Sequence, residues 1–356
     1  MKAIALIVEY NPLHNGHIHH INEAARLFPQ AIIIAILNGD FLQRGEPAIV
    51  DKYTRARWAI QSGCNLAVEL PFAYGTQRAD IFATGAIKIA SGLGVDAIVY
   101  GIEQKLPDNP NLAELAPNQK LGFFYEQAIQ KIDPRIQAIA IPRLYSNYAD
   151  TIPSNKEIAS ATAVRSLVLA HDSAFSNFIP SYVAADMKKL PFAHIAQYLP
   201  LLKYTLLQKN PTALSQFGLH QNTIKELEKA KNFEDFFTAV HHKHTSKTHI
   251  QRMLTYMITS ITQSMLDEAL NSIWTRILAA SPSGLSYLRF IKNNKLIGIS
   301  LIEKSNHLQK PHDMIQYNSV IAYCMLTNQV ISDRLSRENS RKITIIVPPS
   351  HTTKKE

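Results

Sequence analysis

Near the start of the chain stands the stretch Ile7-Val8-Glu9-Tyr10-Asn11-Pro12-Leu13-His14-Asn15-Gly16-His17. An apolar run at residues 2–8 leads into it and predicts a strand, and a helical pattern follows it. Pro12 disfavours a helical conformation at Asn11, so the loop stays open before the helix begins. Gly16 permits a close backbone approach or an unusual dihedral angle. Because a helix N-terminus offers free N–H groups and partial positive charge, this strand-loop-helix predicts a phosphate site.

Two histidines, His14 and His17, bracket the turn glycine. Their rings can flank a triphosphate and donate hydrogen bonds to oxygens that become more negative as pyrophosphate leaves. Such chemistry needs the α-phosphate held in line with a nucleophile, and no covalent protein intermediate. The tetrapeptide alone is a weak signal, and His19 and His20 can be plain surface residues. Its position between a first strand and a helix is what favours a nucleotide site.

The first 170 residues alternate strand-like and helical runs. The run at residues 31–37 is entirely apolar, as expected of a parallel strand covered on both faces. Repeated β-α units predict an α/β fold, a Rossmann-like doubly wound parallel sheet with ligands at the carboxyl ends of its strands. Strands are expected at residues 2–8, 31–37, 65–69, 95–100 and 136–141, and helices at 17–27, 52–62 and 79–92.

The second half of the chain loses this alternation. Helical periodicity marks residues 195–208, 223–239 and 250–278, and a strand-like run follows at 342–347. We therefore expect two domains, a nucleotide-binding domain at residues 1–170 and a mainly helical domain at residues 171–356.

Charge is unevenly distributed between these halves. The net charge is +9, and residues 1–170 contain equal numbers of basic and acidic side chains, so residues 171–356 carry the whole excess. This favours small-molecule chemistry in the first half and a polyanion partner for the second, with a solvated basic face as the alternative. The cluster His241-His242-Lys243-His244, followed by Lys247, His249 and Arg252, fits RNA backbone contact, a solvated surface or, less well without cysteine nearby, a metal site.

Two features bear on the cellular compartment. The N-terminal apolar run is too short for a signal peptide, and nothing approaches the roughly 18 apolar residues of a membrane span. Cys64 and Cys324 lie far apart without a partner motif, so neither a disulfide framework nor a zinc site is expected. A cytoplasmic protein without a membrane partner is the prediction.

A second motif, Ser160-Ala161-Thr162-Ala163-Val164-Arg165, lies at another expected helix start. Ser160 can cap that helix, and Thr162 and Arg165 fall near the same end. Two hydroxyls with a forked guanidinium suit a phosphate. The motif is weak alone, and with the histidine loop it completes the layout of a nucleotidylyltransferase.

Further motifs extend the pattern along the chain: Gly39-Asp40-Phe41-Leu42-Gln43-Arg44-Gly45-Glu46-Pro47-Ala48, Asp51-Lys52, Arg55-Ala56, Val68-Glu69-Leu70-Pro71, Pro117-Asn118, Leu121-Gly122, Arg276-Ile277-Leu278 and Ala280-Ser281-Pro282-Ser283-Gly284. With the two motifs above, they resemble the tRNA(Met) cytidine acetate ligase family, HxGH-type members of the nucleotidylyltransferase superfamily. The resemblance spans most of the chain and is weakest at the C-terminal end.

The resemblance implies a reaction. Acetate and ATP, with Mg²⁺, would form acetyl-adenylate and pyrophosphate, and the acetyl group would pass to N4 of the wobble cytidine of elongator tRNA(Met). The chain would then be an ATP-dependent tRNA ligase whose partners are acetate and that tRNA.

The resemblance also implies site residues. His14 and His17 are the expected catalytic pair. Gly101, Asn118 and Arg143 are expected at the ATP site. As alternatives to this role, Gly101 can be a simple turn, Asn118 a helix cap and Arg143 a surface residue. The expected ATP-binding residues, including three from the second motif, are Ile7, Val8, Glu9, Tyr10, Asn11, Pro12, Leu13, His14, Asn15, Gly16, His17, Ile18, His19, His20, Gly101, Asn118, Arg143, Ser160, Thr162 and Arg165.

The polar loop at residues 39–47 follows the second expected strand at the ligand edge. Its Asp40, Gln43 and Arg44 are therefore candidate contacts for substrate or tRNA. Lys52 and Arg55 open the next helix and can grip phosphates, although a solvated helix face explains them almost as well.

The chain departs from the family pattern at three places. Asp40 stands where the family usually has Asn, which would bring a negative charge near anionic partners. Ile102 replaces a serine in a Gly-Ser-Glu motif, which would add bulk beside the nucleotide. Ser146-Asn147-Tyr148-Ala149 replaces a Gly-Tyr-His motif.

Two other functions compete with the ligase. One is an adenylyltransferase that acts on a phosphorylated metabolite, and the basic second half argues against it. The other is a non-catalytic RNA-binding protein with a relic nucleotide site, and the intact His14, Gly16, His17 and Arg165 argue against that.

Overall fold

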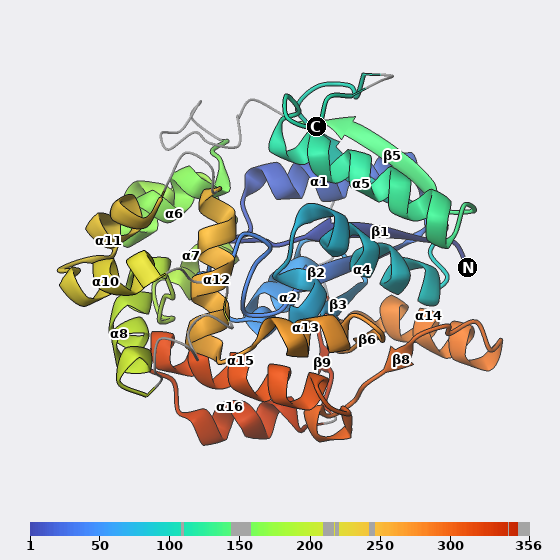
Figure 1. Cartoon of the computed structure of the whole chain (residues 1–356). Helices are drawn as coiled ribbons and strands as arrows, with labels where there is room; N and C mark the ends of the chain where they lie inside the picture. Colours follow the sequence, from blue (N-terminus) through green and yellow to red (C-terminus); the bar gives the residue numbers. More distant parts are fainter. Residues whose placement is uncertain are drawn as a thin grey trace.

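The computed structural model describes residues 1–107, 110–143, 158–208, 217, 221–241, 246–340 and 342–347. A seven-stranded sheet in the order β5-β4-β1-β2-β3-β7-β9 runs through the molecule, with helices on both sides (Figure 1). The strands are β1 (Ala3–Val8), β2 (Ile32–Asn38), β3 (Leu66–Leu70), β4 (Ala97–Ile102), β5 (Gln137–Pro142), β7 (Ile277–Ala280) and β9 (Thr344–Ile345). A separate pair is formed by β6 (Trp274–Thr275) and β8 (Ser300–Leu301).

Helices connect and cover these strands. In the first half they are α1 (Asn15–Leu27), α2 (Lys52–Gln61), α3 (Phe72–Gly75), α4 (Ala79–Gly92), α5 (Pro117–Ile132) and α6 (Ala161–Leu169). In the second half they are α7 (Ser181–Met187), α8 (Tyr198–Gln208), α10 (Gln221–Lys229), α11 (Phe233–Val240), α12 (Lys247–Thr259), α13 (Gln263–Ala269), α14 (Pro282–Asn293), α15 (His312–Thr327) and α16 (Ile331–Glu338). Short 3₁₀ turns are η1 (Ser173–Asn177), η2 (Ile195–Gln197) and η3 (Ser305–His307).

The predicted α/β fold with a doubly wound parallel sheet is confirmed. Strands β1 to β5 pair in parallel, and each expected strand of the first half is found within two residues of its predicted bounds. The exception to parallel pairing is β7, which runs antiparallel to β3.

The predicted helix at residues 250–278 is wrong at its end. α13 stops at Ala269, and β6 and β7 follow it. Short apolar runs such as Ile277–Ala280 are ambiguous between a buried helix and a buried strand. Here the free edge of β3 decides, because β7 pairs with it.

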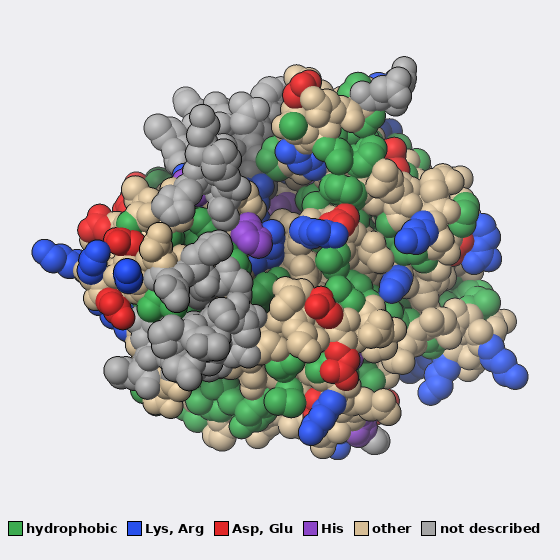
Figure 2. All heavy atoms as spheres, in the orientation of Figure 1, with side chains coloured by type: hydrophobic (Ala, Val, Ile, Leu, Met, Phe, Trp, Pro, Cys, Tyr) green, Lys and Arg blue, Asp and Glu red, His purple; other side chains and the backbone are tan. Residues whose placement is uncertain are grey.

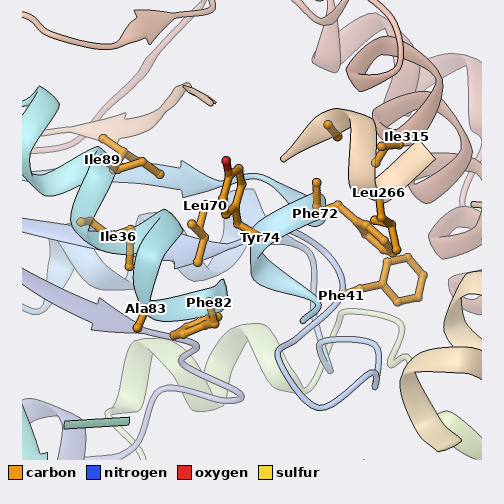
Figure 3. Close-up of a cluster of buried hydrophobic side chains, with 14 of the residues drawn as sticks. Ile36, Phe41, Leu70, Phe72, Tyr74, Phe82, Ala83, Ile89, Leu266 and Ile315 are labelled. Atoms are coloured by element: carbon orange, nitrogen blue, oxygen red, sulfur yellow. The ribbon is translucent and has the colours of Figure 1, made fainter. Parts of the chain in front are cut away.

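The sheet buries both of its faces. Alternate residues of β1 enter different cores: Ala3 and Ala5 join one, and Ile4 and Leu6 join the other. The first core also contains residues from the second half of the chain. Figure 3 shows Leu266 and Ile315 beside Phe72, on the same side of the sheet as Ile36.

The second half therefore completes the first half's core and sheet. Its β7 and β9 extend the sheet beyond β3, and its side chains enter both cores. The expected division at residue 170 marks a change of local pattern and no break in the sheet.

The topology places a crevice beside β1. The chain runs from β1 to β2 on one side, whereas β4 pairs with the opposite side of β1. Loops that leave the carboxyl ends of two such strands diverge, and ligands of doubly wound sheets bind in the resulting crevice.

Two further observations concern the whole described chain. Cys64 and Cys324 are both free and buried. Among the described residues, no helix combines the length and the apolar character that crossing a bilayer requires.

Candidate active site

A cavity of about 440 Å³ opens at the carboxyl ends of β1 and β4. The loop after β1, the N-termini of α5 and α6, the loop at residues 39–47 and the side of α12 form its walls. Of the residues predicted to bind ATP, those that line it are Ile7, Val8, Glu9, Tyr10, Asn11, His14, Gly16, His17, His19, His20, Gly101, Asn118, Arg143, Ser160, Thr162 and Arg165.

His14 and His17 form a reciprocal cap on α1. The backbone N–H of Gly16 donates to Nδ1 of His14 at 3.1 Å, and the backbone N–H of His14 donates to Nδ1 of His17 at 3.2 Å. The two rings stack with their centroids 3.7 Å apart. These contacts satisfy N–H groups that a helix N-terminus otherwise leaves free.

This cap explains the glycine between the histidines. A Cβ atom at Gly16 would lie 2.9 Å from Cε1 of His14, which is too close for any other residue type to fit without displacing the ring. Of the two roles considered for Gly16, the structure supports the close approach, because its φ lies outside the left-handed region.

The same cap sets the protons on the two rings. Because Nδ1 of each ring accepts a hydrogen bond, each neutral imidazole carries its proton on Nε2. Burial, followed by the charges of Arg143 and Arg165, lowers the pKa of His14 to about 3. Burial, followed by His14 and Arg143, holds the pKa of His17 well below its ordinary value. The pair therefore presents two neutral Nε2–H donors at neutral pH.

The second motif forms the part of the cavity wall next to the histidine loop. Ser160 caps α6 by accepting from the N–H of Ala163 at 3.0 Å. Arg165 donates to the carbonyl of Asn11 at 2.8 Å and to Oγ1 of Thr162 at 3.3 Å. Its guanidinium thus ties the start of α6 to the loop after β1, at the cavity wall.

Gly101 and Arg143 lie together at the cavity wall. Gly101 lies inside β4, and a Cβ atom there would approach Cγ of Arg143 to 3.1 Å. The missing side chain therefore leaves room for Arg143, which lines the cavity and is held by its backbone N–H to the carbonyl of Ile102. Neither residue is a simple turn or a remote surface position.

Asn118 also lines the cavity. The N-cap of α5 is Ala116, so Asn118 is not the helix cap that was considered. Its side-chain amide donates to the carboxylate of Glu103. The family-like Pro-Asn motif therefore positions an amide at the cavity wall from the first turn of α5.

The cavity is strongly electropositive. Its wall carries one acidic side chain, Glu9, against six cationic ones: Arg44, Arg78, Lys120, Arg143, Arg165 and Arg252. Figure 2 shows Lys, Arg and His side chains around a hollow on this face of the molecule. A low-dielectric cleft lined by one sign of charge concentrates ligands of the opposite sign.

Of these cations, Arg78 and Lys120 are not among the predicted site residues, and Arg252 is predicted only as part of the basic cluster of the second half. Arg78 precedes α4 and Lys120 lies in the first turn of α5, both helix starts at the ligand edge, so the rule that finds His17 could have found them. Arg252 comes from α12 in the second half, and no local pattern connects it to the first.

A tight contact holds α12 against the loop at residues 39–47. Gly45 has a φ of +80°, and a Cβ there would lie 2.3 Å from the backbone nitrogen of Arg252. Oγ1 of Thr255 donates to the carbonyl of Gly45 at 2.6 Å. The second half thereby supplies Thr248 and Arg252 to the cavity wall.

Comparison with known proteins agrees with this geometry. The sequence matches the HIGH Nucleotidyl Transferase family over residues 1–116 and 108–339. The tRNA(Met) cytidine acetate ligase of Halalkalibacterium halodurans is 33% identical over 349 residues, which cover 81% of this chain and 84% of that protein. The ligase of the same name from Lysinibacillus sphaericus is 31% identical over 365 residues, 85% of this chain and 89% of that protein.

The chain belongs to the tRNA(Met) cytidine acetate ligase family. As a member of a ligase family, it is an enzyme. The fold matches crystal structures of Thermotoga maritima TmcAL. The apo form has a TM-score of 0.85 at 21% identity, with 98% of this chain and 100% of that chain covered. The form bound with alpha-thio ATP has a TM-score of 0.81 at 20% identity.

Some predicted ATP-binding residues of this ligase family member do not line the cavity. Leu13 is fully buried in the core, Pro12 is also buried, and Ile18 packs against the same core. The Asn15 amide donates to the carbonyl of Asn177 at 3.3 Å. The side chains of these four residues hold the loop in place, and ATP binding at these positions stays a prediction.

The prediction for Asp40, Lys52 and Arg55 needs a larger correction. Lys52 and Arg55 are fully buried, Asp40 is nearly so, and none lines the cavity. Arg55 donates to the backbone carbonyls of Glu9, Asn38, Gly39 and Val50. These residues are internal braces and offer no surface to tRNA or substrate. Gln43 and Arg44 do line the cavity.

Lys52 and Asp40 belong to a set that we call the buried ion cluster: Asp40, Asp51, Lys52, Glu69, Arg276, Arg334 and Glu338. The Lys52 ammonium lies 2.7 Å from Glu69 and 3.1 Å from Glu338, and Arg276 lies 2.7 Å from Glu338. Burial alone would lower the pKa of Lys52, but Glu338 and Glu69 outweigh it and raise that pKa. Several family-like motifs therefore meet inside the protein.

The departures from the family pattern find partial explanations. Asp40 pairs with Arg334 of α16, so its charge is neutralised inside the buried ion cluster and does not face an anionic ligand. Ile102 is buried in the core and does not narrow the cavity. Ser146 to Ala149 lie outside the described residues, as do His242, Lys243 and His244.

Proposed function

We propose that this protein activates acetate with ATP as acetyl-adenylate and transfers the acetyl group to N4 of the wobble cytidine of elongator tRNA(Met). Membership of the ligase family and the names of its relatives support this reaction. The basic second half, which reaches the cavity wall through Arg252, favours it over adenylyl transfer to a small phosphorylated metabolite.

One observation carries the proposal: the neutral, capped pair His14 and His17 at the cavity wall. Two Nε2–H donors in fixed positions suit the phosphate oxygens on which charge develops when pyrophosphate leaves. Donors that are already oriented by the helix cap need no rearrangement during the step. We therefore assign them to stabilising the charge on the departing pyrophosphate.

Two cations of the cavity wall are suited to binding the triphosphate. Arg143 and Arg165 share the cavity wall with the histidine pair, both act on the charge of His14, and they would neutralise the triphosphate. The acetate oxygen would then attack the α-phosphorus in line, the bond from that phosphorus to the bridging oxygen would break, and pyrophosphate would leave with the electron pair.

The donor set in the cavity fits Mg²⁺ only when it is carried by the nucleotide. Among the residues that the structure describes, no group of three His, Cys, Asp or Glu side chains is arranged to hold a metal ion. Mg²⁺ commonly binds through one or two carboxylates together with substrate phosphates and water. Bound to the phosphates, it would supply further neutralisation of their charge.

The test uses the whole protein with ATP, isotopically labelled acetate and tRNA(Met). We expect labelled N4-acetylcytidine, detected by mass spectrometry of the digested tRNA, together with pyrophosphate release. The same tRNA with uridine at the wobble position is the control and should take up no label. Pyrophosphate release that requires a phosphorylated metabolite, without label in tRNA, would replace the proposal by the adenylyltransferase.

A further inference from the structure

Acyl transfer to the N4 amine of cytidine requires a group that takes a proton from this amine. The N4 lone pair is delocalised into the base, so N4 becomes a good nucleophile only as it loses a proton. A group at the cavity wall that accepts this proton would assist the second half of the proposed reaction. This inference rests on the proposed function.

Three of the four histidines that line the cavity are poor candidates for this base. His14 and His17 accept backbone hydrogen bonds at Nδ1 and carry their protons on Nε2, so neither ring offers a free lone pair. Nε2 of His20 lies 3.0 Å from the carbonyl oxygen of Val99, so it donates there. Burial lowers the pKa of His20 to about 4, opposed in part by that hydrogen bond.

Glu9 is the one carboxylate among the described residues of the cavity wall. It follows the last residue of β1, and its backbone carbonyl accepts from Nη1 of Arg55 at 2.8 Å. Its Oε1 accepts from the backbone N–H of Gln43 at 2.9 Å. No described residue donates to Oε2, so one oxygen is anchored and the other is available to a ligand.

The surroundings of Glu9 come from four elements. Arg44 and Glu46 approach from the loop at residues 39–47, Arg165 from α6, Arg55 from α2 and Tyr125 from α5. Burial, opposed by the Gln43 hydrogen bond and the two arginines of the cavity wall and aided by Glu46, raises the pKa of Glu9 above 4.5. A carboxylate whose pKa is raised in this way binds a proton more strongly than an exposed carboxylate does.

We propose that the Glu9 carboxylate is the base that takes the N4 proton during acetyl transfer. The N4–carbonyl carbon bond forms, and the bond from that carbon to the phosphate oxygen breaks with its electron pair leaving on AMP. One N4 proton passes to Oε2 of Glu9 and later to water. Glu9 is thus the one acid among the described charged side chains of the cavity wall, and it serves the step that needs a proton acceptor.

Glu9→Gln tests the inference because glutamine keeps an oxygen for the Gln43 N–H but cannot accept the proton. Two rates are measured in the full-length protein: acetate-dependent exchange of pyrophosphate into ATP, and acetyl transfer to tRNA(Met). We expect the transfer to fall by roughly 10²- to 10⁴-fold, and the exchange, which uses the same cavity, to fall far less. The retained exchange also shows that the variant folds.

The pH profile supplies a second readout. Wild-type transfer should rise with pH as the carboxylate loses its proton, and Glu9→Gln should lack that rise. Glu23→Gln removes the same charge from a surface pair with Arg26 on α1 and should change neither rate.

The outcomes separate the two claims. Transfer by Glu9→Gln at the wild-type rate with an unchanged pH profile would overturn the role of Glu9. Equal loss of exchange and transfer would also overturn it, because Glu9 would then serve ATP or Mg²⁺ binding. Wild-type protein that shows no acetate-dependent exchange and no transfer would instead overturn the proposed function.

Discussion

The cavity and the buried ion cluster contain the same types of charged side chain but differ in their balance of positive and negative charge. In the cavity, six cations face one carboxylate, Glu9. In the buried ion cluster, each cation lies against at least one carboxylate, and the whole set is nearly inaccessible. The cavity therefore has positive charge left for an anionic ligand, and the cluster has none.

This difference shows that a charged motif does not reveal its own role. Asp51-Lys52 and Arg276-Ile277-Leu278 look as suited to phosphate as the second motif does, yet they join β3, β7 and α16 inside the protein. What separates the two regions is the presence of a counter-charge from a distant segment. Glu338, near the C-terminal end, contacts Lys52, Arg276 and Arg334.

The largest effect is expected from breaking the buried ion cluster. Lys52→Met leaves Glu69 and Glu338 with fewer partners inside the protein, and removing one member of a buried ion pair costs about 3–5 kcal/mol. The free energy of unfolding from chemical denaturation should fall by that amount. Glu23→Gln, which breaks the exposed pair with Arg26, is the control and should leave the unfolding midpoint in place. An unchanged midpoint for Lys52→Met would mean that the cluster contributes no stability.

The next effect lies in the cavity. His17→Ala removes one of the two Nε2–H donors and should slow adenylate formation by roughly 10²- to 10³-fold, as the loss of an oxyanion donor does elsewhere. Acetate-dependent pyrophosphate exchange measures this rate. Binding of tRNA should stay near the wild-type level. Asn15→Ala, in the same loop but outside the cavity lining, is the matched control. A similar loss in both variants would assign the defect to loop structure.

The buried His14 should make the stability of the protein depend on pH. The pKa of His14 is about 3 in the folded protein, below the ordinary value of 6.5, so the unfolded chain binds more protons between these values. The free energy of unfolding is therefore not reduced by His14 above pH 6.5, and it falls as the pH drops from 6.5 toward about 3. The slope for one histidine is about 1.4 kcal/mol per pH unit. His14→Asn keeps a capping acceptor and should flatten the fall between about pH 6 and 5. An equal slope in both proteins would contradict a neutral buried His14.

The smallest effect is expected at Asp40. Asp40→Asn restores the residue usual in the family and keeps one oxygen, whereas Asp40 uses one oxygen for the backbone N–H of Lys52 and the other for Arg334. The substitution removes the charge and leaves one of these two donors without its acceptor, so the free energy of unfolding should fall by about 1 to 2 kcal/mol. Arg334 retains Asp51 and Glu338. A rise in stability would show that the Asp40 charge is not needed inside the cluster.

The first half of the fold could be predicted because its signals are local. The all-apolar run of β2, the alternation of strands and helices and the histidine loop each lie within a few residues. Most predicted cavity residues follow from the rule that ligands bind at strand carboxyl ends.

Long-range pairing limited the rest of the prediction. The strands β7 and β9 gain their identity from β3 and from each other across the chain. Burial of Lys52 depends on Glu338, 286 residues away. The position of Arg252 in the cavity also depends on a distant segment, because α12 packs against Gly45. No local periodicity records such contacts.

The most direct measurement is isotope exchange between labelled pyrophosphate and ATP, with and without acetate and with and without tRNA. We expect exchange that requires acetate in the wild-type protein and is nearly lost in His17→Ala. Exchange without any carboxylate, or equal exchange in His17→Ala, would contradict the claim that the paired histidines serve carboxylate activation.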